Sequence, residues 1–243
     1  INEGEGNWTS TILSLPDDHP EVIEMTTINE FLKGHFWACK APVRLVYKSN
    51  AFNGGRLSTP FQNLPDRKVR IRINTLIDEQ SICEVDFNAN HLRLNLAFRA
   101  KENAGDTPYE DIGEIAGVNN RDQIKRIITV AMGASDEAGG YGSLYTEGFN
   151  KAYVRRIHDA ALKRFPKLQL FRGWGVYAQN FEGQILKDVM LQGVKKDIVC
   201  LPVHDAVAVQ QQHQEWAKEV MLETWSRHMD GVKTKVKVDM PSV

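Results

Sequence analysis

Apolar residues along this 243-residue chain recur at two different spacings. In several long segments they return every three or four positions, which places them on one face of an α-helix. In shorter runs they are β-branched and bounded by turn residues, as in strands. The helical spacing predicts helices over about 21–36, 88–98, 121–135, 146–165, 176–192 and 212–229, and the shorter runs predict strands over about 43–47, 68–74, 81–87, 198–203 and 206–209.

Turn residues separate these segments. Residues 1–20 contain two prolines, and residues 49–65 contain Asn-Gly-Gly and two more prolines, so both are expected to be loops. Asn120 stands directly before a helical segment and is expected to cap it. Helices and strands follow one another without strict β-α-β alternation, which predicts an α+β fold.

The composition is that of a globular protein. Hydrophobic residues make up 42% and charged residues 25% of a chain long enough to bury a sizeable core. No apolar run reaches the roughly 18–20 residues needed to span a bilayer, so no membrane partner is expected. Cys39, Cys83 and Cys200 lie far apart, and no secretion signal precedes them, which fits a cytoplasmic protein without a disulfide framework. The chain does not begin with Met and is expected to be a piece of a longer one.

Charge is unevenly distributed, although the net charge is only −1. Residues 1–30 carry seven acidic residues and no Lys or Arg, whereas residues 44–72 carry seven basic residues and one Asp. Residues 121–172 carry ten basic and five acidic residues. Basic segments within a near-neutral chain favour a localised surface for a polyanion, although solvated charge alone also explains such runs.

Two carboxylates stand at the ends of predicted strands. Asp205 interrupts the apolar run IVCLPVHDAVAV, and Asp86 ends the strand SICEVDF. If the strands are neighbours, the two carboxylates meet at one edge of a sheet, where Mg²⁺ is held by one or two carboxylates and substrate phosphates. For either residue alone, a turn or a cap is the simpler explanation.

Cations occur at spacings suited to phosphate. Arg121 and Lys125 lie one helical turn apart, where they can hold a triphosphate. Arg56 follows two glycines, which allow a polynucleotide backbone to approach closely. Solvated helix charge and an ordinary surface loop remain the alternatives for these residues.

Taken in order, these segments resemble the motifs of the family A DNA polymerases, the group that includes bacterial DNA polymerase I. The resemblance extends over about residues 44–228 and rests on five short motifs in the same order. GRLSTPFQNLP resembles that family's GRLS…NLQNIP loop, VDFNANHLRL its motif A, RDQIKRIITVAMGA its motif B, WGVYAQNFEGQILKDVML its minor-groove helix, and PVHDAVAV its motif C.

The resemblance implies a polymerase palm, an antiparallel sheet backed by helices, with reduced helical fingers. The palm is expected over 44–100 and 171–243 and the fingers over 101–170. Residues 1–43 are expected to be an N-terminal helical segment, a remnant of a thumb. The spacing leaves no room for an exonuclease domain or most of a thumb, as in divergent members from phages and mobile elements.

The resemblance also implies roles for single residues. Asp86, Asp205 and the main-chain carbonyl of Phe87 are expected to bind two Mg²⁺ ions, with Mn²⁺ as an alternative. Lys125 is expected to bind the nucleotide and to give a proton to pyrophosphate. The remaining expected nucleotide contacts are Arg121, His91, Thr129 and Gly133, and the expected DNA contacts are Arg56, Asn63, Asn180, Glu182 and His204.

Five positions within these motifs depart from the family pattern. His91 replaces the motif A Glu that obstructs a ribose 2′-hydroxyl, and Thr129 and Gly133 replace aromatic residues of motif B. Ala206 replaces the Glu that ends motif C, and Glu182 replaces a Gln that reads the minor groove. The metal ligands are thus retained while the residues around the nucleotide are changed.

The expected function is template-directed nucleotidyl transfer, with primer–template DNA and deoxynucleoside triphosphates as partners. A separate thumb, processivity, helicase or primase protein is a further expected partner. The changed pocket residues leave ribonucleotide transfer by a primase or RNA polymerase open. The missing thumb leaves open a catalytically idle DNA-binding module, and His204-Asp205 leaves open a metal-dependent hydrolase.

Overall fold

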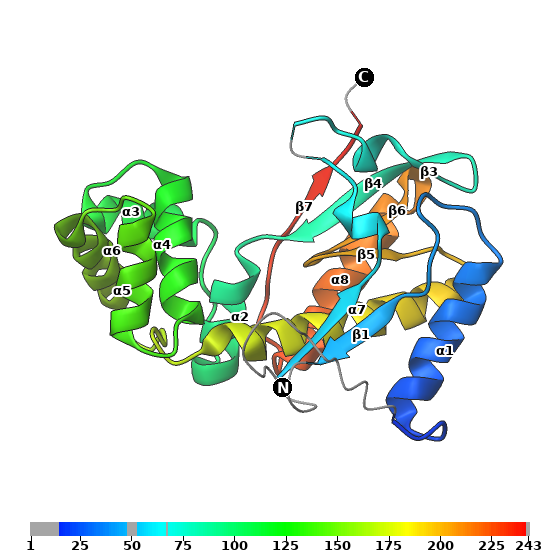
Figure 1. Ribbon diagram of the computed structural model, residues 1–243, viewed down its shortest axis with the longest axis horizontal. Coiled ribbons are helices and arrows are strands. Elements are labelled where there is room, and N and C mark those ends of the chain that lie inside the picture. Colours follow the sequence, from blue (N-terminus) through cyan, green and yellow to red (C-terminus); the bar gives the residue numbers. More distant parts are fainter. Residues whose placement is uncertain (1–14, 48–52, 67, 242–243) are drawn as a thin grey trace, which may run out of the picture.

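The computed structural model describes residues 15–47, 53–66 and 68–241 and has the α+β fold predicted from the sequence. The chain forms a helical lobe and a sheet lobe (Figure 1). Among the described residues, no helix combines the length and the hydropathy that crossing a membrane requires. The helical lobe consists of α3 (Pro108–Ala116), α4 (Arg121–Gly133), α5 (Glu137–Thr146) and α6 (Lys151–Arg164), and α2 (Asn90–Ala100) and α7 (Trp174–Lys196) join it to the sheet lobe.

The main sheet is antiparallel and has β4 at its centre. Its order is β3 (Leu76–Ile77), β4 (Gln80–Phe87), β6 (Ala206–Gln210) and β5 (Leu201–Val203), and β7 (Val236–Asp239) also pairs with β4. Asp86 lies opposite Ala206 on one side and opposite Lys237 on the other. Directly paired residues of antiparallel strands share a face, so these three side chains are neighbours on one face of the sheet.

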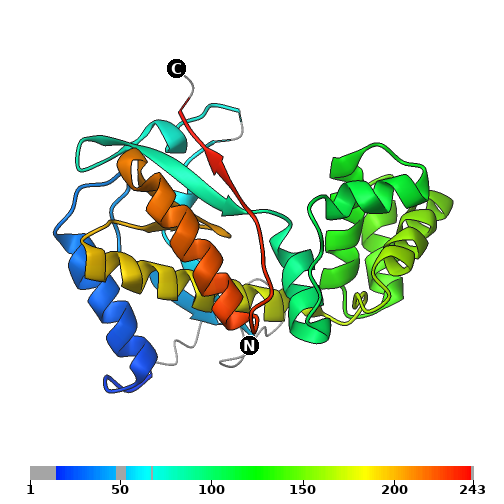
Figure 2. The ribbon, with the colours of Figure 1, turned by 180° about the vertical axis from the view of Figure 1, so that it is seen from behind.

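Helix α8 (Gln214–His228) packs against the sheet, as seen from behind in Figure 2. Its inward positions Ala217, Val220, Met221 and Trp225 are buried in the core that the sheet and α7 complete. The indole of Trp225 donates a hydrogen bond to Asn90 Oδ1 at 3.1 Å. One polar contact thus joins α8 to the start of α2, just beyond the end of β4.

A second antiparallel pair, β1 (Arg44–Tyr47) and β2 (Gly54–Ser58), packs on α7 beside α1 (Pro20–Lys33). The approach of β2 to α7 is close because Gly55 and Gly183 face each other without side chains. Helix α1 is held by the buried Lys187 of α7, whose ammonium group lies 2.5 Å from a carboxylate oxygen of Glu24. Helix α7 therefore supports the β1–β2 pair directly and adjoins the main sheet through α8.

Several expectations from the pattern need correction. The stretch 68–74, expected as a strand, is a turn followed by a 3-10 helix at Arg72–Asn74, because Arg72 turns inward to pair with Glu84. The expected loop at 49–65 contains β2, and the spacing did not predict α3, α5 or β7. Most of the loop expected at 1–20 and part of the 49–65 stretch lie outside the described residues. The other expected helices and strands are present with small changes at their ends.

Candidate active site

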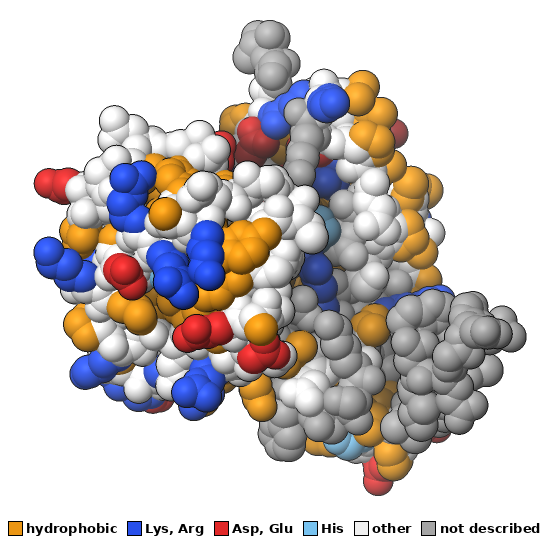
Figure 3. Space-filling view, turned by 60° about the vertical axis from the view of Figure 1, so that its left-hand side comes forward, with side chains coloured by type: hydrophobic (Ala, Val, Ile, Leu, Met, Phe, Trp, Pro, Cys, Tyr) orange, Lys and Arg blue, Asp and Glu red, His pale blue; other side chains and the backbone are white. Residues whose placement is uncertain are grey.

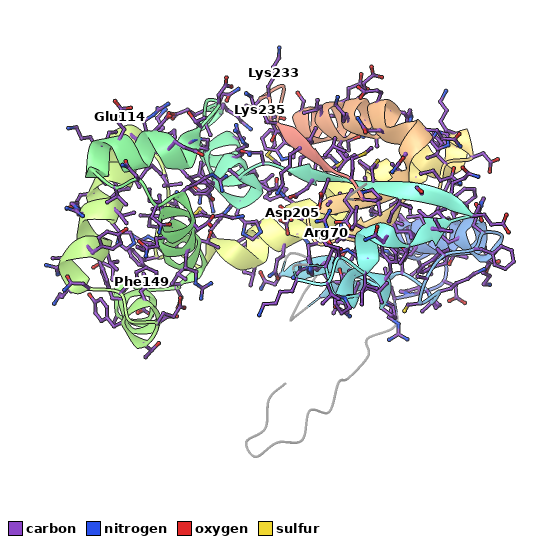
Figure 4. All side chains as sticks on the ribbon, turned by 90° about the horizontal axis from the view of Figure 1, so that it is seen from above. Arg70, Glu114, Phe149, Asp205, Lys233 and Lys235 are labelled. Carbon is purple, nitrogen blue, oxygen red and sulfur yellow. The ribbon has the colours of Figure 1, made fainter. Side chains whose placement is uncertain are left out.

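Asp86 and Asp205 are brought together by the pairing of β4 with β6. Asp86 is the next-to-last residue of β4, and Asp205 lies in the two-residue turn between β5 and β6. The main-chain N–H of Phe87 donates to the main-chain oxygen of Asp205 at 3.3 Å, which extends the strand pairing by one step. Figure 4 shows Asp205 near the middle of the molecule, where the two lobes meet. The neighbouring carboxylates expected from the sequence are therefore present at one end of the sheet.

The surroundings of this carboxylate pair favour a bound cation. Burial, together with the negative charges of Glu182 and Asp86, raises the pKa of Asp205 to about 7. Asp86 Oδ1 is buried without a hydrogen-bond partner, while Asp86 Oδ2 accepts the ammonium group of Lys237 at 2.9 Å. An unpartnered buried oxygen beside a second carboxylate is suited to a hard cation.

The donor set fits Mg²⁺ that is shared with a substrate. In the described part of the chain, no group of three or more His, Cys, Asp or Glu residues could hold a metal on its own. Mg²⁺ is commonly held by one or two carboxylates together with substrate phosphates and water. Asp86 and Asp205 meet that requirement, and the main-chain carbonyl of Phe87 is the adjacent oxygen expected as a further ligand.

Glu182 does not lie on an open surface, which corrects its expected position in a minor-groove contact. It is only 5% exposed, and its carboxylate accepts from Asn90 Nδ2 at 3.1 Å and pairs with His91 Nε2 at 2.9 Å. A buried carboxylate must find such partners, because an unpaired charge costs several kcal/mol. Glu182 thus holds His91 in place beside the carboxylate pair.

The pKa directions agree with an ion pair between these two residues. Burial lowers the pKa of His91, but the Glu182 carboxylate outweighs burial and the net shift is upward. For Glu182 burial raises the pKa, and His91 outweighs it in the opposite direction, so the pKa is lowered. Each partner therefore stabilises the charged form of the other. His91 is brought to the site as expected, but as part of a pair that the sequence did not reveal.

Helix α4 carries the expected nucleotide-binding residues along one side. Its N-cap Asn120 accepts from the N–H of Gln123 at 3.1 Å, as the sequence predicted. Successive steps of four positions along α4 place Arg121, Lys125, Thr129 and Gly133 on neighbouring turns. Lys125 and Gly133 are exposed, and Gly133 lies against Gly175 at the start of α7.

Tyr109 of α3 contacts α4 and is close enough to Asp205 to feel its charge. Tyr109 is buried and shares a hydrogen bond with Thr129. The guanidinium carbon of Arg121 lies over the Tyr109 ring, 5.5 Å from the ring centre. Burial raises the pKa of Tyr109 to about 12, and the charge of Asp205 contributes in the same direction. Arg121 also donates to Glu110 at 2.8 Å. Arg121 is therefore held by two neighbours on α3, whereas Lys125 is exposed.

The expected DNA contacts divide into two groups. Arg56 of β2 reaches His204 in the turn beside Asp205, with Nη2 and Nδ1 2.5 Å apart, and Asn180 of α7 lies close to Gly55. Arg56 and His204 therefore lie next to Asp205, and Asn180 lies against the strand that carries Arg56. Asn63 is exposed at the end of a short 3-10 helix that packs against β5. The hollow between the lobes contains Lys, Arg and His side chains (Figure 3).

Lys237 was not singled out by the sequence. It lies in the alternating segment KTKVKVD, where Val236 and Val238 face the core and Lys237 faces the other way. Alternation of this kind is the signal that could have identified β7 as a strand. Its partner strand could not be read from the pattern.

The class of fold that the chain adopts is that of a polymerase domain. Among solved structures, one similar to this chain is the POL domain of Pol1 from M. smegmatis, in a complex with a DNA primer-template and dNTP. The TM-score is 0.54, the sequence identity is 15%, and the similarity covers 89% of this chain and 50% of that one. This chain thus spans half the length of that domain. No protein-family model matches the sequence, and no curated protein is similar to it.

Proposed function

We propose that this protein is a template-directed nucleotidyltransferase, and specifically a DNA-directed DNA polymerase of the family A type acting on a primer–template. The observation that carries the proposal is the meeting of Asp86 and Asp205 at one end of paired strands, although they lie far apart in the sequence. Support also comes from the polymerase-domain fold. Arg121 and Lys125 on α4 add cations of the kind a triphosphate requires.

Asp86 and Asp205, with the carbonyl of Phe87, would hold Mg²⁺, or Mn²⁺ in its place. When bound, such ions lower the pKa of an attacking hydroxyl and neutralise charge on the phosphates. Arg121 and Lys125 bind the triphosphate, and Lys125, the more exposed of the two, gives a proton to the leaving pyrophosphate.

The remaining residues position the substrates. His91, held by Glu182, and Thr129 would lie on the sugar side of the nucleotide, and Gly133 would lie near the templating position. Arg56 and Asn180 would face the minor groove of the duplex, and His204 would lie near the primer terminus. Glu182 acts through His91 and is no longer proposed as a DNA contact.

This proposal assigns the two lobes to polymerase subdomains. Residues 44–100 and 171–243 would form the palm, and residues 101–170 the reduced fingers. Residues 1–43 would be the remnant of a thumb. A partner protein could then supply the missing thumb contacts to the duplex.

Ribonucleotide transfer is the second candidate. It is favoured by His91, which stands where the resembled motif has the Glu that obstructs a ribose 2′-hydroxyl, and by Gly133, which stands where that family has a Tyr. Parallel assays with dNTPs and rNTPs on the same template separate the two candidates. Salt-dependent DNA binding without extension by either substrate would instead indicate an idle binding module.

Primer extension with Mg²⁺ or Mn²⁺ tests the main proposal. Asp205→Asn removes one ligand and is expected to lower the extension rate by at least about 10²–10³-fold, the usual effect of removing a group that stabilises the transition state. Asp197→Asn is the control, because Asp197 is exposed at the end of α7 in the left-handed conformation that Asn tolerates. Extension that survives Asp205→Asn would refute the mechanism.

A further inference from the structure

The face of the sheet that carries Asp86 holds two other acidic residues with basic partners. Glu84 and Asp239 lie directly opposite each other on β4 and β7, two residues along from the Asp86–Lys237 pair. Arg72 donates to both oxygens of Glu84, at 2.7 and 3.0 Å. Arg70 donates to both oxygens of Asp239, at 2.7 and 2.9 Å. Both of these carboxylates are therefore held by a guanidinium in two-point contact.

Asp86 is held differently. Its partner is a lysine, which contacts one oxygen only and leaves the other oxygen buried and unbonded. The Lys237 side chain is 64% exposed, whereas that of Arg72 is 12% exposed. A lysine is a point charge on a flexible stem, and it gives up such a contact more readily than a planar guanidinium does.

The position of Lys237 is set by the backbone. Lys237 is the direct cross-strand partner of Asp86, and Val236 and Val238 on either side are packed against the core. The strand therefore cannot slip by one residue without burying the ammonium group. Core packing therefore fixes the backbone of Lys237 beside Asp86. The Lys237 side chain can still swing outward.

From this contrast we propose that Lys237 is the exchangeable counter-ion of Asp86. Its ammonium group neutralises the carboxylate when no metal is bound and must leave for a divalent cation to bind. The proposal rests on the metal-binding role proposed for Asp86. It extends that role, because the affinity of the site for the cation is then set partly by competition within the chain.

Competition between Lys237 and a divalent cation predicts opposite changes in metal affinity for two substitutions. Lys237→Met keeps the length of the side chain but removes the competing charge, so divalent binding should tighten by about three- to tenfold, the range of a partly exposed ion pair. Lys237→Arg keeps the charge and can contact both oxygens of Asp86, so binding should weaken by a similar factor. If Lys237 had a purely structural role, Lys237→Met and Lys237→Arg would not change the metal affinity in opposite directions.

Lys235 provides the control. It lies two residues away and forms a comparable ion pair with Asp106 at 2.7 Å, apart from Asp86. Lys235→Met removes the same charge but no contact with the carboxylate pair. Screening by salt then limits its effect on divalent binding to less than about twofold.

The test is a titration of the full chain with Mn²⁺ alone, followed by electron paramagnetic resonance and without nucleotide or DNA. The proposal is supported if Lys237→Met tightens and Lys237→Arg weakens Mn²⁺ binding, and if Asp86→Asn abolishes the difference between them. Equal effects of Lys235→Met and Lys237→Met would overturn it, and so would absence of saturable Mn²⁺ binding in Lys237→Met. Because the readout is binding, it is independent of polymerase activity. Thermal melts of each variant check that the fold is retained.

Discussion

The contact between Gly183 and Gly55 allows a stringent test of how the β1–β2 pair is placed on α7. A β-carbon added to Gly183 would lie 1.7 Å from the carbonyl oxygen of Gly55, and this neighbour is backbone that no rotamer change can move. Gly183→Ala therefore forces β2 to retreat from α7. Because β2 carries Arg56, the retreat also disturbs the contact between Arg56 and His204.

Two opposing effects determine the size of the change. Ala is favoured over Gly inside a helix by about 1 kcal/mol. Overpacking against a rigid neighbour typically costs about 1–3 kcal/mol, and an overlap this severe belongs at the upper end. Gly183→Ala should thus lower the free energy of unfolding by about 2 kcal/mol, which for a chain of this size corresponds to a Tm roughly 4–8 °C lower.

Gly142→Ala is the matched control. Gly142 is also inside a helix, and a β-carbon there would meet no atom within 4 Å. Only the gain in helix propensity remains, so the Tm of Gly142→Ala should be roughly 2–4 °C above that of the unchanged protein. Thermal unfolding followed by circular dichroism measures both variants, and primer extension should fall in Gly183→Ala only. If Gly183→Ala were as stable as Gly142→Ala, the close approach of β2 to α7 would be wrong.

Three further predictions concern buried polar groups. Burial lowers the pKa of His158 to about 4 in the folded state, compared with 6.5 for the exposed side chain. As the pH falls below 6.5, His158 is therefore protonated in the unfolded state before it is protonated in the folded state. The free energy of unfolding should therefore drop by about 2–3 kcal/mol between pH 7 and 4.5 in urea titrations, and this part of the drop should vanish in His158→Gln. In Glu182→Gln the pKa of His91 should fall, because the carboxylate that raises it is gone; an unchanged His91 titration by NMR would contradict the ion pair. Trp225→Phe leaves Asn90 Oδ1 without its indole donor and should cost about 1–3 kcal/mol in chemical denaturation, whereas full stability would show that the hydrogen bond contributes nothing.

Local signals explain what the sequence predicted correctly. Asn120 caps α4 through an interaction that spans three residues, and the apolar periods of α6, α7 and α8 depend only on neighbouring turns. The segment 68–74 misled because Arg70 and Arg72 alternate with apolar residues as they would in a strand. Their actual partners, Asp239 and Glu84, lie on β7 and β4. Local alternation cannot distinguish a basic strand from a turn whose arginines reach distant carboxylates.

In the candidate site, too, local features could be predicted from the sequence and contacts between distant segments could not. Asp86 and Asp205 could be predicted because each interrupts an apolar run at a strand end. The partnership of His91 with Glu182 could not, since it joins α2 to α7 through burial, and burial removes Glu182 from the surface on which it was expected. Lys237 was missed because a single lysine in an alternating strand carries no sign of which carboxylate lies opposite.

The register of three strands shows how Ala206 and Lys237 determine the charge around Asp86. Ala206, Asp86 and Lys237 lie side by side across β6, β4 and β7 on one face of the sheet. The resembled motif has Glu at the position of Ala206, which would set a like charge directly opposite Asp86. Here Asp86 has a small neutral neighbour on one side and an ammonium group on the other, so this row of the sheet is neutral instead of strongly acidic. On the proposal made above, a divalent cation would bind at this row only when it outcompetes Lys237 for Asp86.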